Sequence, residues 1–233
     1  MIYVISDIHG CHKQFLNMLK LIDFSAKDDL FVLGDVVDRG EAPIPLLLDI
    51  MGRKNIHLIK GNHDDLAEKL LSKVYIDGVD TLTSVDIKCL SNWLCSGGIT
   101  TKEQFRNLDG ETQKELLNYI RGSPAYQELV VNNQRFILVH GGLPDFDPNR
   151  MIGEYDEQKL LSTRTDYSMQ YYENRFLVTG HTPTFLINEE YRGKIYRKHN
   201  HIALDCGSVF GENLGCICLN NMKEYYVKRR LML

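Results

Sequence analysis

The chain has 233 residues, of which 43% are hydrophobic and 25% are charged, as is usual for a soluble globular protein with a sizeable core. Its formal net charge of −4 argues against a protein that coats nucleic acid or an anionic membrane. No apolar stretch approaches the ~20 residues of a membrane span, and residues 2–6 lack the flanks of a signal peptide. We therefore expect one domain over 1–233 in the cytoplasm, with neither a nucleic-acid-binding patch nor membrane contact.

Short β-type runs alternate with helical patterns in the first part of the chain. Strands are predicted at 2–6, 30–34 and 56–61, and helices at about 15–22, 43–51 and 64–73. Further β-type runs follow in the second half, at 136–140, 176–180, 202–206 and 215–219, with an alternating run at 224–230 that is typical of an edge strand. This order predicts a layered α/β fold in which two packed sheets have helices on the outside.

The segment from about 74 to 134 has a different pattern. It contains the only tryptophan, Trp93, a break at Gly97-Gly98, and a helix over 112–121 that ends at Gly122. Thr112 and Glu115 have the spacing of a capping box at the start of that helix. We predict a helical cap inserted between two strands, which serves either as structural filler or as a surface that contacts the substrate.

Five of the predicted strands end, next to a glycine, in residue types that bind metal ions. These ends are Asp7-Ile8-His9-Gly10, Asp35 to Gly40, Gly61-Asn62-His63-Asp64, His140-Gly141-Gly142 and Gly180-His181-Thr182. In an α/β sheet the carboxyl ends of the strands meet in one crevice, and a glycine there permits tight turns and close approach of the backbone. We therefore predict that these side chains lie together in one site.

Carboxylate, amide and imidazole groups in one site suit divalent ions such as Mn²⁺, Fe²⁺ or Zn²⁺. Six protein ligands exceed what one ion needs if it must also bind water, but they suit two ions that share a bridging carboxylate. A single histidine at a strand end would more often be structural, but the agreement of five strand ends favours a metal site. We expect two divalent ions, with manganese as the first choice and iron or zinc as alternatives.

The series DIHG, GDVVDRG, GNHD, HGG and GHT, in this order, resembles the phosphoprotein phosphatase branch of the calcineurin-like binuclear metallophosphoesterases. Within that branch the chain is most similar to the small bacterial and phage lambda-type serine/threonine phosphatases. The resemblance extends from residue 3 to about residue 218, and GDVVDRG together with GNHD is its specific part. It implies a metallophosphoesterase-type β-sandwich flanked by helices, and hydrolysis by attack of a metal-bridging hydroxide on phosphorus.

The resemblance also implies a role for each residue of the site. The implied metal ligands are Asp7 and His9 for one ion, Asn62, His140 and His181 for the other, and Asp35 for both. The implied phosphate-binding residues are Arg39, Arg164 and Asn62. His63 is implied as the acid that protonates the leaving alkoxide, with Asp38 as the residue that orients it. These roles are physically reasonable, since arginine binds phosphate oxygens in pairs and an alkoxide leaves poorly without a proton.

Two enzymatic readings of the substrate remain open. One is a phosphomonoester, above all a serine/threonine phosphoprotein, and the other is a dinucleoside polyphosphate such as diadenosine tetraphosphate, or an RNA cap. Symmetrical diadenosine-tetraphosphate hydrolases resemble this chain but commonly have alanine at the position of Asp38. A diphosphate leaves without help from an oriented acid, so Asp38 favours phosphomonoesters. A non-catalytic scaffold is disfavoured because none of the expected ligands is missing.

Overall fold

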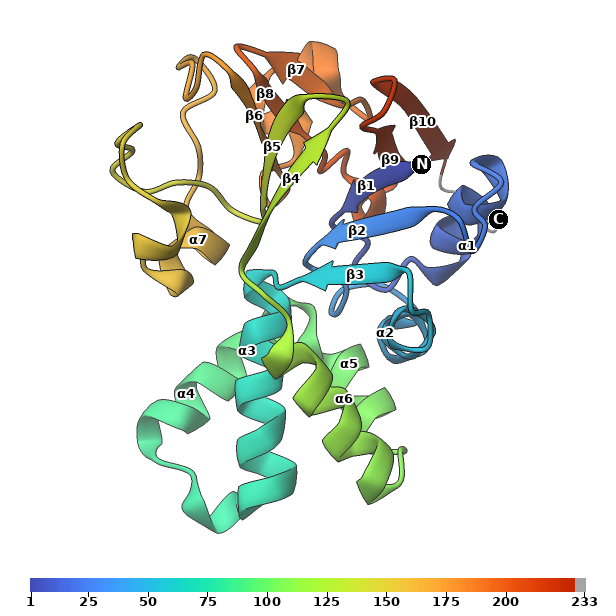
Figure 1. Ribbon diagram of the computed structural model, residues 1–233. Coiled ribbons are helices and arrows are strands. Elements are labelled where there is room, and N and C mark those ends of the chain that lie inside the picture. Colours follow the sequence, from blue (N-terminus) through green and yellow to red (C-terminus); the bar gives the residue numbers. More distant parts are fainter. Residues whose placement is uncertain (229–233) are drawn as a thin grey trace.

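Two sheets of five strands each pack face to face in the computed structural model, which describes residues 1–228 (Figure 1). The first sheet has the order β10-β9-β1-β2-β3, and its central strands β1, β2 and β3 are parallel. Its strands are β1 (Ile2–Ser6), β2 (Asp29–Leu33), β3 (Ile56–Ile59), β9 (Asn213–Cys218) and β10 (Lys223–Lys228). The second sheet has the order β4-β5-β6-β8-β7, and β5, β6 and β8 are parallel. Its strands are β4 (Tyr126–Val131), β5 (Gln134–Val139), β6 (Arg175–Thr179), β7 (Tyr196–Lys198) and β8 (His201–Ala203).

Helices cover the outer faces of both sheets. The helices are α1 (His12–Leu21), α2 (Pro43–Met51), α3 (Asn62–Ser72), α4 (Ser84–Trp93), α5 (Ile99–Phe105), α6 (Gly110–Gly122), α7 (Glu157–Ser162) and α8 (Thr184–Ile187). Helices α3 to α6 gather below the sheets in Figure 1, where the chain passes from β3 in one sheet to β4 in the other. Helix α7 lies beside the second sheet, and its Leu160 and Leu161 pack with Ile137 and Leu177 of that sheet.

The central strands of the first sheet, β1, β2 and β3, are buried on both sides, which explains their nearly continuous apolar sequences. In β1 the side chains of Tyr3 and Ile5 pack with the helices, whereas Val4 packs with the second sheet. This alternation follows from the two-residue period of a strand. A strand covered on both faces cannot alternate apolar with polar residues, so it reads as an uninterrupted apolar run. The predicted α/β sandwich with outer helices is confirmed.

The helical segment predicted over 74–134 is shorter than expected. It is helical, with kinks, as far as Gly122, but Tyr126–Val131 form β4, which pairs antiparallel with β5 at the edge of the second sheet. Strand β4 was missed because it lies at an edge, where half-exposed polar residues break up the apolar pattern. The run at 224–230 is an edge strand as predicted for its described part, and Arg229 and Arg230 lie outside the described residues.

The capping box predicted at Thr112 is wrong, because α6 begins earlier. Its N-cap is Asp109, whose carboxylate accepts hydrogen bonds from the backbone N–H of Glu111 at 3.0 Å and of Thr112 at 2.9 Å. The Thr112 hydroxyl donates to the same carboxylate at 2.7 Å. An aspartate at this position satisfies two of the free N–H groups at the helix start, so it displaces threonine as the cap.

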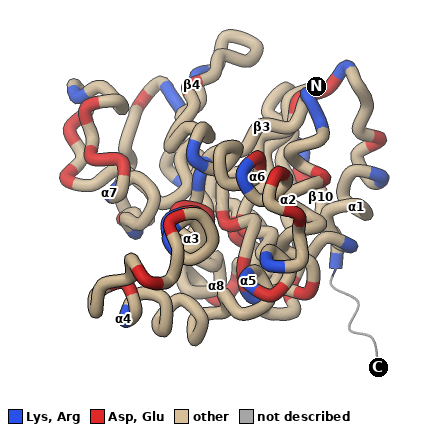
Figure 2. The backbone as a smooth tube through the Cα atoms, turned by 90° about the horizontal axis from the view of Figure 1, so that it is seen from below, with Lys and Arg blue, Asp and Glu red and all other residues tan. Residues whose placement is uncertain are grey.

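Basic and acidic residues are interspersed along the chain in the view from below (Figure 2). Four of the six cysteines are buried, whereas Cys89 and Cys95 in the helical segment are exposed. Among residues 1–228, no helix combines the length and the apolar character that a membrane crossing requires.

Candidate metal centre

The predicted ligands lie at the carboxyl ends of the parallel strands of both sheets. Asp7 and His9 follow β1, Asp35 follows β2, and Asn62 begins α3 just after β3. His140 follows β5 and His181 follows β6 in the other sheet. Contacts at this edge join the two sheets, since the N–H of His181 donates to Oδ2 of Asp7 at 3.0 Å and Nδ1 of His140 lies 2.6 Å from the carbonyl oxygen of Leu33. The site therefore draws its side chains from both halves of the sandwich.

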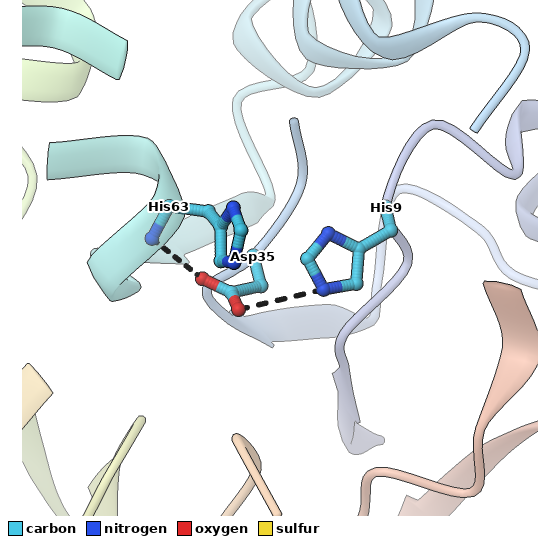
Figure 3. A group of neighbouring side chains, drawn as sticks. All are labelled: His9, Asp35 and His63. Carbon is cyan, nitrogen blue, oxygen red and sulfur yellow. Dashed lines mark hydrogen bonds and ion pairs between the residues drawn. The ribbon is translucent and has the colours of Figure 1, made fainter. Parts of the chain in front are cut away.

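Asp35 is at the centre of two groups of possible metal ligands. One group is His9, Asp35 and His63, and the other is Asp35, His140 and His181; within each, the ligand atoms lie within 4.8 Å of one another. Figure 3 shows the first group, in which Asp35 Oδ2 lies 3.5 Å from Nε2 of His9. The other oxygen, Oδ1, lies 3.3 Å from Nε2 of His140. A carboxylate with one oxygen toward each group is placed to bridge two ions.

The imidazoles of His9 and His140 are oriented by backbone carbonyl groups. Nδ1 of His9 lies 2.8 Å from the carbonyl oxygen of Val37, and Nδ1 of His140 lies 2.6 Å from that of Leu33. Donation at Nδ1 makes Nε2, which faces Asp35, the nitrogen available to a metal ion, which is how proteins hold histidine ligands of metal ions. Nε2 of His140 also lies 3.1 Å from Oδ1 of Asn62. These facing ligand atoms fit a cation between them.

The pKa values of the buried groups also indicate that the site lacks positive charge. Burial disfavours the charged form of His140, but the negative charges of Asp35 and Asp7 outweigh it and raise its pKa to about 10. Burial raises the pKa of Asp7 to about 6 against the opposing effect of His140, and the neighbouring charge of Asp35 adds to that rise. Burial lowers the pKa of His181 to about 4, with help from His140. The residues therefore fit a site for divalent cations.

The backbone at the site is bent into the left-handed region. Six non-glycine residues of the site have φ between 43° and 70°: Asp7, His9, Asp35, Asp38, Arg39 and His181. This conformation costs roughly 1–2 kcal/mol for a residue with a Cβ atom, and it persists only where the surrounding structure fixes it. The sharp turn after each strand directs the side chain back over the strand end and into the site.

Glycines permit the strand ends to approach this closely. A Cβ atom on Gly61 would lie 2.3 Å from the backbone nitrogen of Asp35. One on Gly180 would lie 1.9 Å from Oγ of Ser6 and 2.3 Å from Oδ2 of Asp7. The predicted close approach of backbone beside the ligands is thus present on both sides of the centre.

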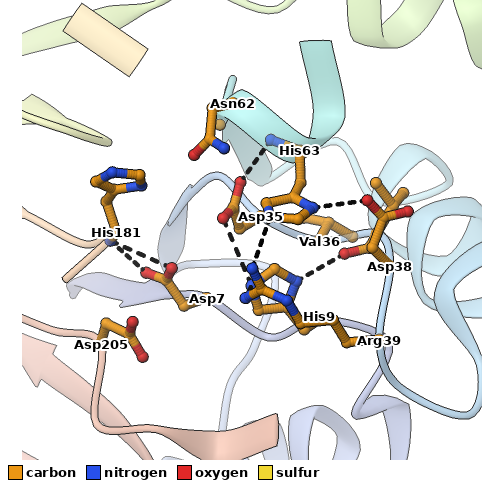
Figure 4. Close-up of polar contacts among 12 residues, drawn as sticks. Asp7, His9, Asp35, Val36, Asp38, Arg39, Asn62, His63, His181 and Asp205 are labelled. Atoms are coloured by element: carbon orange, nitrogen blue, oxygen red, sulfur yellow. Dashed lines mark hydrogen bonds and ion pairs between the residues drawn. The ribbon is translucent and has the colours of Figure 1, made fainter. Parts of the chain in front are cut away.

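His63 and Asp38 form the predicted pair, and Arg39 lies next to them (Figure 4). Nδ1 of His63 is 2.6 Å from Oδ2 of Asp38. The two terminal nitrogens of Arg39 lie 2.6 Å from Nε2 of His9 and 2.7 Å from Nε2 of His63. Burial lowers the pKa of His63, but the hydrogen bond to Asp38 and the charge of Asp35 exceed that effect, and the net shift is upward. In this structure the guanidinium of Arg39 supplies the positive charge between the two imidazoles.

The helical segment contacts the site through Asp38. Trp93, at the end of α4, donates from Nε1 to Oδ2 of Asp38 at 2.8 Å. Thr101 in α5 donates its hydroxyl to Oδ1 of Asp38 at 2.7 Å and accepts the backbone N–H of Asp38 at 2.9 Å. The N–H of Arg39 donates to the carbonyl of Gly97 at 2.9 Å. Asp38, Trp93 and Thr101 are each at most 1% exposed, so the segment is more than filler.

Arg164 lies on the opposite side of the centre from Arg39. It is exposed, and its Nη1 donates to Oγ1 of Thr182 at 3.2 Å. Its charge also contributes to the lowered pKa of His181, after burial and His140. The two arginines predicted to bind phosphate therefore approach the centre from different directions.

Two buried aspartates near the centre were not predicted to matter. Asp64 accepts hydrogen bonds from the N–H groups of Val36 and Gly61 at 3.0 Å, so it ties the loop after β2 to the start of α3. Asp205 lies beside Asp7 and His181 in Figure 4, and burial together with the charge of Asp7 holds its pKa well above the usual range. Asp205 was missed because it lies inside the run predicted as a strand over 202–206, whereas strand β8 ends at Ala203 and leaves Asp205 just beyond the strand end.

Comparison with known proteins identifies one family over most of the chain. The model of the calcineurin-like phosphoesterase family matches residues 1–203. A symmetrical bis(5'-nucleosyl)-tetraphosphatase of Wigglesworthia glossinidia brevipalpis is 37% identical over 99 residues, which are 40% of this chain and 36% of that protein. An asymmetrical bis(5'-nucleosyl)-tetraphosphatase of Oceanobacillus iheyensis is 24% identical over 91% of this chain and 85% of its own length. The chain spans less than half the length of the first curated relatives it matches.

Solved structures share the fold. One, of a protein named as a candidate diadenosine tetraphosphatase, superposes with a TM-score of 0.68 and 16% identity over 97% of this chain and 92% of its own. Another, a protein serine/threonine phosphatase from Saccharomyces cerevisiae with similarity to human phosphatase PP5, has a TM-score of 0.61 and 17% identity over 100% of this chain and 81% of its own. At these identities the likeness concerns the fold alone.

Proposed function

Since the chain belongs to the calcineurin-like phosphoesterase family and is a metal-dependent phosphoester hydrolase, we propose that its substrates are dinucleoside polyphosphates such as diadenosine tetraphosphate. The observation that carries this proposal is the agreement among the relatives, which are named bis(5'-nucleosyl)-tetraphosphatases whether the match covers 40%, 74% or 91% of the chain. It takes precedence over the serine/threonine protein phosphatase favoured by the sequence motifs.

The proposed metal site consists of the six residues predicted from the strand ends. In this proposal Asp35 would hold both ions, Asp7 and His9 would hold one of them, and Asn62, His140 and His181 would hold the other. Two divalent ions, manganese first and iron or zinc as alternatives, would activate a water molecule and neutralise phosphate oxygens. His63 has a ring nitrogen close enough to count as a ligand, but its Nδ1 is bound to Asp38, which favours proton transfer.

The remaining residues bind phosphate and deliver a proton. Arg39 and Arg164 would hold the phosphate chain from two sides, and the amide of Asn62 would assist. Because Arg39 donates to His9 and His63 in this structure, its guanidinium must turn toward the phosphate when a substrate binds. Nε2 of His63 would then face the leaving oxygen, while Asp38 holds Nδ1 and fixes the orientation of the ring.

A specific observation favours a second candidate, hydrolysis of phosphomonoesters as in a protein phosphatase. The Asp38–His63 pair is intact at 2.6 Å, and an alkoxide leaving group needs such an acid. A diphosphate leaves without it, so the pair is not required by the first candidate. It is compatible with both.

A panel of substrates on manganese-loaded protein tests the proposal. Diadenosine tetraphosphate, a phosphoserine peptide and p-nitrophenyl phosphate are compared by kcat/KM, and the nucleotide products are separated by chromatography. Addition of one water molecule yields either two ADP or one AMP and one ATP, so the products also identify the bond that is cleaved. We expect diadenosine tetraphosphate to have the highest kcat/KM.

The Asp35→Asn variant serves as the matched control, because it keeps the size of the bridging side chain while weakening its charge. It should lose activity on every member of the panel together with bound metal. A phosphoserine peptide that exceeds diadenosine tetraphosphate in kcat/KM would overturn the nucleotide proposal in favour of the second candidate.

A further inference from the structure

An exposed phenylalanine lies next to the arginine proposed to bind phosphate. The Phe210 side chain is 56% exposed, although a large aromatic ring is normally buried. The guanidinium carbon of Arg39 lies 5.8 Å from the centre of the Phe210 ring, within the range of a cation–π contact. Among residues 1–228, Phe210 is the only phenylalanine whose side chain counts among the exposed large apolar ones.

The ring of Phe210 is held by a rigid turn. The turn over Ser208–Phe210 is bounded by Gly207 and Gly211, both in the left-handed region with φ of 85° and 98°. The N–H of Phe210 donates to the carbonyl of Gly207 at 2.9 Å, and the buried hydroxyl of Ser208 donates to Gln14 at 2.9 Å. The exposure of the ring is therefore a fixed feature of the fold.

A second aromatic ring supports the first. Phe185 in α8 meets Phe210 edge to face, with ring centres 6.2 Å apart and an interplanar angle of 88°. The guanidinium of Arg192 lies over Phe185 at 4.6 Å, and ion pairs to Glu189 and Glu212 hold that guanidinium in place. Phe185 is half-buried, so the pair presents the outer ring, Phe210, to solvent. We call Phe210 and Phe185 the aromatic shelf.

The position of the aromatic shelf restricts what it can bind. A ligand that reaches Arg39 with a phosphate group has the Phe210 ring within reach of its next chemical group. In a nucleotide, that group is a sugar with a flat base, and bases stack on exposed aromatic rings in a largely sequence-independent way. In a phosphoserine peptide, the phosphate is followed by the serine methylene and then by backbone, which gain little from a flat ring.

We propose that the aromatic shelf is the nucleobase-binding site, on which one base of a dinucleoside polyphosphate stacks against Phe210 while its phosphate chain contacts Arg39. This inference rests on the proposed function, because it takes the same substrate and names the residue that recognises its base. The shelf selects nucleotides over other phosphoesters without contacting the reacting atoms. Stacking on a single ring discriminates poorly among bases, so adenine and guanine nucleotides should bind similarly.

Binding measured by calorimetry on manganese-loaded protein tests the shelf without requiring turnover. ADP and pyrophosphate are the two probes, since they share the diphosphate and differ in the nucleoside. In Phe210→Ala we expect the Kd for ADP to rise roughly ten-fold and the Kd for pyrophosphate to stay within about two-fold, as for loss of one stacked base. Phe210→Trp, which keeps an aromatic face, should retain the affinity for ADP. Met151→Ala, which removes another exposed apolar side chain, should change neither.

The outcomes separate the shelf from the proposed function. Unchanged ADP affinity in Phe210→Ala would overturn the shelf, and so would equal losses for ADP and pyrophosphate, because the ring would then only support Arg39. A loss confined to a phosphopeptide with an aromatic residue beside its phosphoserine would overturn it in favour of a peptide surface. If the shelf binds ADP as expected but diadenosine tetraphosphate is not hydrolysed, the shelf stands and the proposed substrate fails.

Discussion

The hydroxyl of Thr101 offers the sharpest test of how the helical segment contributes to catalysis. It donates to Oδ1 of Asp38 and accepts the N–H of the same residue, while the other carboxylate oxygen contacts His63 and Trp93. Thr101→Val removes the hydroxyl and keeps the branched shape. Thr101→Ser keeps the hydroxyl and removes a methyl group, so the two variants separate hydrogen bonding from packing.

The expected magnitude follows from the burial of these groups. Thr101 and Asp38 are fully buried, so Thr101→Val leaves a charged acceptor and a backbone donor without partners. That loss should destabilise the protein by about 2–4 kcal/mol, which a typical domain tolerates. A carboxylate that can rotate holds His63 less well. We therefore expect the rate of steps that need the proton to fall roughly ten-fold, which is about 1.4 kcal/mol, whereas a general acid as a whole accelerates such steps ~10²–10⁴-fold.

The assay compares two small substrates that differ in their leaving groups. Glycerol 2-phosphate releases an alkoxide that needs a proton, whereas p-nitrophenyl phosphate releases a phenolate that leaves unaided. In Thr101→Val, kcat/KM for glycerol 2-phosphate should fall roughly ten-fold and that for p-nitrophenyl phosphate about two-fold or less. Thr101→Ser should resemble the parent protein on both. Trp93→Phe, which removes the other donor to Asp38, should shift the ratio in the same direction.

Equal losses on the two substrates in Thr101→Val would refute the reasoning, because the hydroxyl would then support the fold or the metals instead of the acid. So would a Thr101→Ser variant as impaired as Thr101→Val, since the defect would lie in packing. Metal content per chain is measured alongside and should stay near that of the parent protein.

Three further predictions concern metal, backbone and pH. Chelation should abolish activity and Mn²⁺ restore it, with close to two ions per chain by metal analysis; full activity in excess chelator would contradict the binuclear site. Gly180→Ala should empty the site of metal, because its Cβ atom would lie 2.3 Å from Asp7, while Gly122→Ala, which meets nothing within 4 Å, should leave metal content unchanged. Burial lowers the pKa of His201 to about 4, so the unfolded chain binds a proton first as the pH falls. The stability that comes from keeping His201 neutral is fully present above its unfolded pKa of ~6.5, and the free energy of unfolding should fall by about 2 kcal/mol between pH 7 and pH 5. Urea titrations at several pH values measure this fall, which should be smaller in His201→Phe.

The site residues at the strand ends could be predicted from the sequence because the pattern that indicates them is local. A strand buried on both faces reads as an apolar run, and the polar residue and glycine that follow it stand next to it in the chain. Five such ends recur, and parallel strands bring their carboxyl ends to the same edge. The six proposed ligands therefore needed no knowledge of long-range contacts.

The residues that surround the proposed ligands and the acid could not be predicted, because the residues they contact are distant in sequence. Trp93 and Thr101 lie 55 and 63 residues from Asp38, and no local pattern joins a tryptophan in a helical segment to an aspartate after a strand. Phe210 is one of two adjacent apolar residues between glycines in the sequence, and its exposure depends on how α8 and the turn before β9 pack. The N-cap at Asp109 was missed for a different reason, since Thr112 and Glu115 have the spacing of a capping box one turn further along the chain.

The aspartate that made the sequence resemble a phosphomonoesterase proves to be a weak guide to the substrate. Asp38 is hydrogen-bonded to two residues of the helical segment as well as to His63. Asp38 therefore also serves to attach the helical segment to the site. An oriented acid is needed for an alkoxide, but its presence does no harm to a diphosphate leaving group. Retention of Asp38 therefore permits both substrates and excludes neither. What separates them is the surface beyond the reacting phosphate, and there the exposed ring of Phe210 beside Arg39 suits a nucleotide better than a peptide.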